Sequence, residues 1–259
     1  MTYAAVNAKL CAMGSRLLKP QDYEAISQME LPEDIMEWLK HTPDYSDSGL
    51  HKLIEAPGQL ITEAAADICR YIADKPQRDY ITAMAASAFA EGQLHYYTAQ
   101  WKSLSRLDKS NRAALRSTLG AEIDLKNILS MYRLKRYHRV IGDSTYGHLI
   151  PIRYRISHEA TRRMADCTTP KALLDEVARC PYASDFAYIK AETSGQTEEI
   201  SSRSKPTPEQ ILATAIERRY QLAARRFASS LAPTVAYLYK KKQEVQNLVA
   251  AMEVLQRMT

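Results

Sequence analysis

Positively charged residues and tyrosines gather between residues 131 and 163. This stretch holds eight Lys and Arg residues but two acids, with Tyr132, Tyr137, Tyr146 and Tyr154 interleaved. Cations that neutralise phosphates and rings that stack on bases are the raw material of a nucleic-acid site. No helix-turn-helix signature or RNP aromatic pattern accompanies them, and Arg and Tyr are also enriched in protein–protein interfaces. A basic, all-helical nucleic-acid-binding protein therefore stays open as an alternative.

The familiar catalytic motifs do not occur in the sequence. It contains no H-E-x-x-H, no P-loop, no G-x-S-x-G elbow and no dinucleotide-binding glycine fingerprint. We therefore predict no catalytic residue, no metal ligands and no bound cofactor. An enzyme whose site converges from distant residues is a further alternative, because one sequence does not reveal such a site.

The cysteines and the apolar segments indicate the cellular compartment in which we expect the protein. Cys11, Cys69, Cys167 and Cys180 form no C-x-x-C pair, so we expect reduced thiols in a cytosolic protein. No signal-peptide pattern opens the chain. The longest apolar stretch, residues 81–90, is too short to span a bilayer, so we expect no direct membrane insertion.

The composition predicts an all-α protein. Glycine is scarce, with 8 in 259 residues, and the residues that helices tolerate best dominate the sequence. Pro32 and Pro43 bound one short helix, and residues 50–73 read as a long one. The stretch 108–137 reads as one helix, or as two with a break near Gly120. The segment "LIPIRYRI" is the sole strand candidate.

Charge is unevenly distributed along the chain. Residues 1–80 carry 8 Lys and Arg against 13 acids, a net charge of −5, so the remainder carries 27 against 17, a net charge of +10. Such asymmetry is compatible with an acidic partner for the later part, and equally with an ordinary surface.

Two weak internal repeats occur in the same order. In the first, a proline-bounded helix pattern recurs 138 residues later and is followed in each copy by a tyrosine, Tyr45 and Tyr182. In the second, an acid, an apolar residue and an asparagine recur 120 residues later, as Asp124 and Asn127 and then as Glu244 and Asn247. Together they indicate that a helical unit was duplicated.

The motifs around these repeats resemble the C subunit, called d in eukaryotes, of V-type and A-type rotary ATPases. The central motif is an acid, an apolar residue, two spacers and Asn, then apolar residues and a basic R-x-K. The residues that fit it are Asp124, Leu125, Asn127, Ile128, Leu129, Arg133 and Lys135. "WLKHTPDY" resembles the family's short helices, as "VARCPY" does more loosely. "YLYKKKQEVQNL" resembles its C-terminal motif through Tyr237, Leu238, Lys241, Glu244, Asn247 and Leu248.

The resemblance implies an all-α fold of three related helical units arranged as a funnel. This chain is short for the family, and the acid–Asn motif has no copy between residues 188 and 210, so one unit is expected to be reduced. We predict a first helical unit over 1–141 and a second, shortened unit over 142–189. An exposed loop over 190–210 and the C-terminal helices of the last unit over 211–259 follow.

The resemblance also implies a function. It indicates a non-catalytic central-stalk subunit of the rotor that couples the membrane proteolipid ring to the rotating shaft and so supports H⁺ or Na⁺ transport. Its partners would be the ring and the shaft subunits, with no nucleic acid, and it would lie peripherally on the cytoplasmic face of the membrane. The structural or interface candidates are Asp124, Asn127, Arg133, Lys135, Glu244 and Asn247. We expect Asn127 to hydrogen-bond neighbouring backbone or side chains where units meet, and Arg133 and Lys135 to pair with acids in the next unit or at the docking surface.

Overall fold

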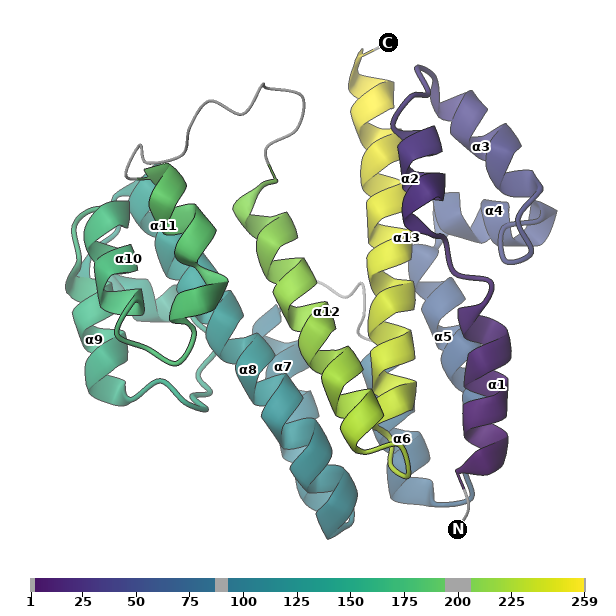
Figure 1. Cartoon of the computed structure of the whole chain (residues 1–259), viewed down its shortest axis with the longest axis horizontal. Coiled ribbons are helices and arrows are strands. Elements are labelled where there is room, and N and C mark those ends of the chain that lie inside the picture. Colours follow the sequence, from purple (N-terminus) through teal and green to yellow (C-terminus); the bar gives the residue numbers. More distant parts are fainter. Residues whose placement is uncertain (1–2, 87–92, 194–205, 259) are drawn as a thin grey trace. The chain divides into compact units, whose positions relative to one another are not determined.

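The computed structural model is all-α, as the composition predicts (Figure 1). It describes residues 3–86, 93–193 and 206–258, and no residue in these ranges belongs to a β-strand. The helices are α1 (Ala4–Gly14), α2 (Pro20–Ile26), α3 (Pro32–Lys40), α4 (Asp47–Glu55), α5 (Pro57–Cys69), α6 (Lys75–Ala86), α7 (Gln93–Ser103), α8 (Lys109–Arg133), α9 (His158–Asp166), α10 (Pro170–Val177), α11 (Ala187–Thr193), α12 (Pro208–Arg226) and α13 (Ala232–Met258). Short 3₁₀ turns lie at Leu104–Arg106, Gly142–His148 and Ala183–Asp185, and a π-helical turn at Leu134–His138.

Prolines set where several of these helices begin. Pro32 opens α3, which ends at Lys40 before Pro43, so the predicted proline-bounded helix is confirmed. The single long helix predicted over residues 50–73 is wrong, because α4 ends at Glu55 and α5 begins at Pro57. Proline has no N–H to continue a helix, and its ring clashes with the preceding turn.

The chain divides into two compact units, which are built from discontinuous segments. Unit 1 comprises Met1–Glu91, Ser103–Ala114 and Tyr220–Thr259, and unit 2 comprises Gly92–Lys102 and Leu115–Arg219. Helices α8 and α12 contribute residues to both units. The predicted boundaries at 141, 189 and 210 follow chain order instead, and they stay a prediction about repeats. Of the predicted loop, residues 190–193 belong to α11 and 208–210 to α12, while 194–205 lie outside the described residues.

In unit 1, α13 is the helix around which the others are organised. It packs against α1, α3, α4 and α5, and α5 also packs along α6. Apolar side chains of these helices are fully buried, as a packed helical core requires. They include Ile35, Leu39, Leu53, Ile61, Ile68, Ile81 and Val245.

In unit 2, α9, α10 and α11 pack in sequence, and α8 carries the polar groups that tie the connecting segments down. Helix α8 is continuous through Gly120, so the break considered there does not occur. A Cβ atom on Gly120 would lie 2.4 Å from Cγ of Tyr154. Glycine at this position therefore allows the Tyr154 ring to lie directly on the helix backbone.

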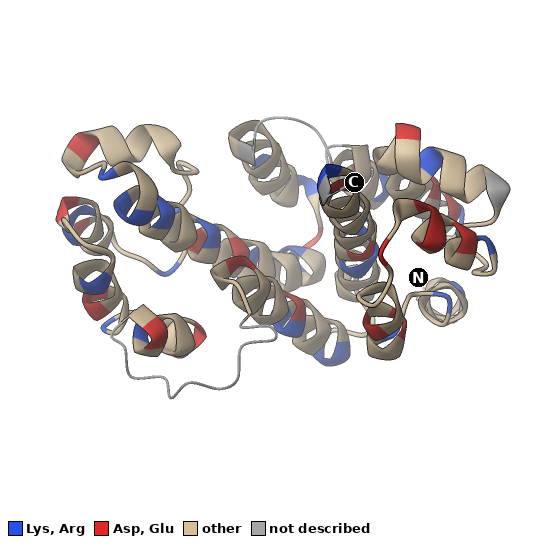
Figure 2. Ribbon diagram, turned by 90° about the horizontal axis from the view of Figure 1, so that it is seen from above, with Lys and Arg blue, Asp and Glu red and all other residues tan. Residues whose placement is uncertain are grey.

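Cations and acids are mixed within both units. Figure 2 shows Lys and Arg interspersed with Asp and Glu on the helices of each unit. Although the later part of the sequence has a positive net charge, acids of unit 2 form ion pairs with its cations. Glu176, for example, lies 3.0 Å from Arg163. Pairs of this exposed kind contribute little to stability.

Candidate functional site

The carboxylate of Asp124 lies buried in the middle of α8, with 1% of the residue exposed. Its Oδ1 accepts a hydrogen bond from the backbone N–H of Tyr154 at 3.1 Å, and its Oδ2 accepts one from the N–H of Arg155 at 2.7 Å. The hydroxyl of Tyr182 also donates to Oδ2, at 2.9 Å. Burial raises the pKa of Asp124 above its ordinary value and outweighs these hydrogen bonds, which lower it.

Asn127 lies one turn further along α8 and is likewise buried. Its Nδ2 donates to the carbonyl of Ile150 at 3.0 Å, and its Oδ1 accepts from the N–H of the same residue at 2.8 Å. Both residues lie in the compact unit 2, but they lie on opposite sides of the predicted boundary at residue 141, so the expectation that Asn127 bonds where repeated units meet stays a prediction.

The side chains of Asp124 and Asn127 provide hydrogen-bond partners for the backbone of residues 150–155. The backbone groups of an irregular segment need partners, and here two side chains of α8 supply several of them. The sole strand candidate, "LIPIRYRI", does not form a β-strand. Its apolar residues Leu149, Ile150 and Ile156 are nevertheless buried, and the segment that carries them is irregular.

Glu244 of α13 occupies the corresponding position in unit 1 and is 3% exposed. Its Oε1 accepts from the hydroxyl of Tyr45 at 2.6 Å, and its Oε2 accepts from the backbone N–H of Leu18 at 2.6 Å. Lys241 donates to Oε1 at 2.8 Å and to Asp44 at 2.8 Å. The buried carboxylate is thus paired and fully hydrogen-bonded, as a buried charge must be.

The two sequence repeats therefore supply the two partners of the same type of contact, which occurs once in each unit. In each unit, the tyrosine that follows the proline-bounded helix donates to the acid of the long helix, and a connecting segment donates a backbone N–H to the same acid. Sequence reasoning recorded both tyrosines but did not pair them with the acids. The signal was their recurrence directly after both helices.

The two copies differ in two respects. In unit 1 the lysine at position 241 pairs with Glu244, whereas the corresponding position in unit 2, 120 residues earlier, is Ala121. Asn247 is exposed, so it does not repeat the buried contacts of Asn127. Of the six candidates, Asn247 and Arg133 are the ones with exposed side chains.

The basic end of α8 is only partly as predicted. Arg133 pairs with an acid, Glu209, at 2.6 Å. The prediction that Lys135 pairs with an acid is wrong, because its amine donates to the carbonyls of Val140 at 2.8 Å and Ala165 at 2.5 Å. Ala165 lies in the last turn of α9, where carbonyls lack helical partners and need a donor. Burial lowers the pKa of Lys135 from its ordinary value.

Several residues of the basic stretch that could form a nucleic-acid site make contacts within the protein instead. Arg136 donates to the hydroxyl of Tyr132 at 2.7 Å, and the Tyr132 ring is buried, so it offers no free face for base stacking. In the described ranges, no group of three or more His, Cys, Asp or Glu side chains is placed to hold a metal ion. Nor does any helix of the described part combine the length and apolar character that a membrane crossing requires.

The comparison with known families matches a part of the chain that contains most of these residues. The family model described as ATP synthase (C/AC39) subunit matches residues 93–257, more than half of the chain, and it includes both acid motifs. No curated protein matches the chain. The resemblance inferred from the motifs is therefore confirmed. The chain belongs to the ATP synthase (C/AC39) subunit family, which implies a subunit of a V/A-type ATPase.

Proposed function

We propose that the chain is a non-catalytic central-stalk subunit that couples the membrane proteolipid ring to the rotating shaft. The observation that carries this proposal is the family match over residues 93–257, which spans the long helices α8 and α13 and the acid motif of each. In this role the chain transmits torque and performs no chemistry itself.

The geometry of the acid motifs supports a mechanical role. Asp124 and Glu244 are buried, and their carboxylate oxygens accept hydrogen bonds from groups inside the protein. They therefore hold connecting segments against long helices. Hydrogen bonds to buried charges are costly to break, and this resists local opening under load. A part that must carry torque without deforming benefits from such contacts.

We propose that the chain binds the ring and the shaft from the cytoplasmic face, as a peripheral subunit held by the complex. Arg133 and Asn247 are the exposed members of the motifs and are the ones proposed to face a partner. The four-part division of the sequence and the funnel implied by the resemblance stay predictions.

The proposal is tested by affinity purification of the tagged chain from detergent-solubilised membranes of its native host, followed by mass spectrometry. We expect the nucleotide-binding head subunits and the proteolipid to be recovered with it. Recovery of the chain alone, or with nucleic acid, would contradict the proposal and return attention to residues 131–163. An Asn247→Ala variant that is recovered normally would remove that residue from the interface.

A further inference from the structure

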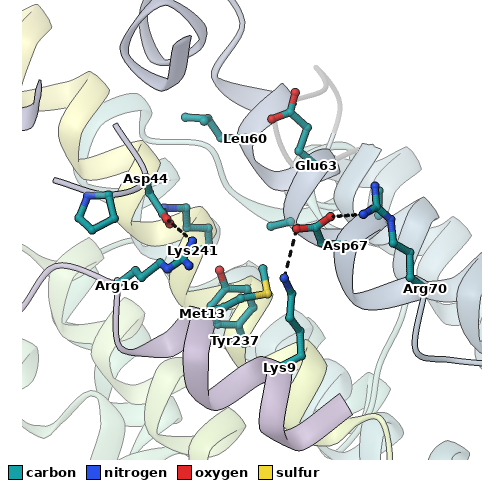
Figure 3. Close-up of a pocket in the computed structure, with 13 residues that line it drawn as sticks. Lys9, Met13, Arg16, Asp44, Leu60, Glu63, Asp67, Arg70, Tyr237 and Lys241 are labelled. Atoms are coloured by element: carbon teal, nitrogen blue, oxygen red, sulfur yellow. Dashed lines mark hydrogen bonds and ion pairs between the residues drawn. The ribbon is translucent and has the colours of Figure 1, made fainter. Parts of the chain in front are cut away.

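Unit 1 contains a hollow of about 450 Å³ that the motifs did not indicate. It lies between α1, α5 and α13 (Figure 3). Met13 and Leu60 are among its apolar lining residues, and charged side chains also line it. Figure 3 shows the side chains of Lys9, Arg16 and Tyr237 directed towards the same space.

The hydroxyl of Tyr237 is the first reason to expect a ligand. The residue is 6% exposed, and its hydroxyl has no hydrogen-bond partner among the described residues. Burial, together with the carboxylates of Asp44 and Glu244, raises the pKa of this phenol above its ordinary value, so it keeps its proton. Tyr237 lines the hollow, so a ligand held there can supply the acceptor that the described residues do not provide.

The cations beside Tyr237 are the second reason. Arg16 Nη1 lies 3.9 Å from Asp44 Oδ1, and Lys9 Nζ lies 3.4 Å from Asp67 Oδ2. Both distances exceed the roughly 2.7–2.9 Å of a charge-assisted hydrogen bond. Lys241, in contrast, holds Asp44 at 2.8 Å. Arg16 and Lys9 therefore retain donors for a further acceptor.

Four cations and three acids line the hollow, so its net charge is positive, and the three donors with spare capacity suit an anion such as a carboxylate. We propose that the hollow receives the carboxylate of an Asp or Glu side chain from an acidic segment of a partner subunit, held by Arg16 and Tyr237 with Lys9 beside it. Arg16 has 55% of its side chain exposed and Arg70, at the rim, 77%, so a protein surface can reach the opening. The identity of the partner rests on the proposed function.

Zero-length carbodiimide coupling of the purified native complex tests this proposal, because it joins an amine only to a carboxylate in contact with it. We expect mass spectrometry to find Lys9 joined to an Asp or Glu of another subunit. Tyr237→Phe should lower the yield of that product at least about fivefold, the effect of losing one good hydrogen bond. Tyr71→Phe, at a tyrosine that is 50% exposed, is the matched control and should leave the yield unchanged.

Coupling of Lys9 to Asp67 of its own chain alone would overturn the proposal, as would a yield that Tyr237→Phe leaves intact in a variant that folds normally by circular dichroism. Calorimetric binding of glutarate, lost in Arg16→Gln and without any cross-link to a partner, would overturn the protein source in favour of a small dicarboxylate. Recovery with proteins other than ATPase subunits would contradict the proposed function. A product that joins Lys9 to one of those proteins would still support the proposal that the hollow receives a carboxylate. Recovery of the chain alone would overturn both.

Discussion

The hydroxyl of Tyr182 donates a hydrogen bond to Asp124 although the two residues lie 58 positions apart in the chain. The bond joins the segment after α10 to the middle of α8, and the Tyr45–Glu244 pair makes the same connection between α3 and α13. The same contact in both units is what the sequence repeats encode. Several of its consequences can be measured.

Removing the Tyr182 hydroxyl should destabilise the protein. In Tyr182→Phe the buried carboxylate of Asp124 loses one of its donors, and hydrogen bonds to charged groups contribute about 1.5–3 kcal/mol. Urea denaturation should show this loss in the free energy of unfolding. Tyr137→Phe, at a tyrosine that is 67% exposed, should change it by less than about 0.5 kcal/mol. Equal effects of the two substitutions would refute the structural role of the Tyr182 contact.

Replacing Asn127 by alanine should lower the free energy of unfolding by about 1–3 kcal/mol, because both backbone groups of Ile150 lose a buried partner. The matched variant is Asn247→Ala, at the exposed repeat position, which should cost less than about 0.5 kcal/mol. Chemical denaturation of both proteins measures the difference. A surface-like effect at Asn127 would contradict the proposed role of its side chain in holding the segment around Ile150.

Asp124 should make stability depend on pH in the direction opposite to that of an ordinary ion-paired acid. Its folded pKa is raised above the unfolded value near 3.8, so the folded state binds more protons and the contribution of Asp124 to stability falls as pH rises through this window. Because asparagine does not titrate, the stability of wild type relative to Asp124→Asn should decrease as pH rises above about 4, the ordinary pKa of the carboxyl group. Denaturation of both proteins across this range measures it, and an advantage that grows with pH would contradict the burial argument.

Adding one methyl group at Gly120 should be harmful, although alanine favours helices. The new Cβ would lie 2.4 Å from Cγ of Tyr154, so the ring and its segment must move. Overpacking typically costs about 1–3 kcal/mol, which exceeds the roughly 1 kcal/mol gained in helix propensity. Gly14→Ala is the control, because nothing lies within 4 Å of its Cβ and it should be neutral or stabilising. Thermal unfolding that ranks the two variants in the reverse order would disprove the close contact.

Local rules predicted much of this fold. Prolines and charged ends gave α3 its bounds, and the low glycine content gave the all-α class, because both depend on residues close in sequence. The division of residues 50–73 at Pro57 followed from the same rules and was overlooked. The contacts of Lys135 were not predictable, because its carbonyl partner Ala165 is brought to it by tertiary packing.

The candidate site was predicted in composition but not in geometry. The recurrence of Asp124 and Glu244 marked the right helices, yet the pattern did not say that each acid meets a tyrosine from another helix. The sequence did not predict the hollow around Tyr237, although Tyr237 and Lys241 belong to the C-terminal motif, because its lining combines residues of three helices with residues of the segments between helices. Such convergence is a property of the folded chain alone.

The central claim is that this chain turns with the rotor, and single-molecule rotation tests it most directly. The head of the purified complex would be fixed to glass, and a gold bead would be attached through a biotinylated tag at the C-terminal end of α13. We predict that ATP drives stepwise turning of the bead, and that an inhibitor of the head stops it. A bead that stays still while the same complexes hydrolyse ATP would contradict the account.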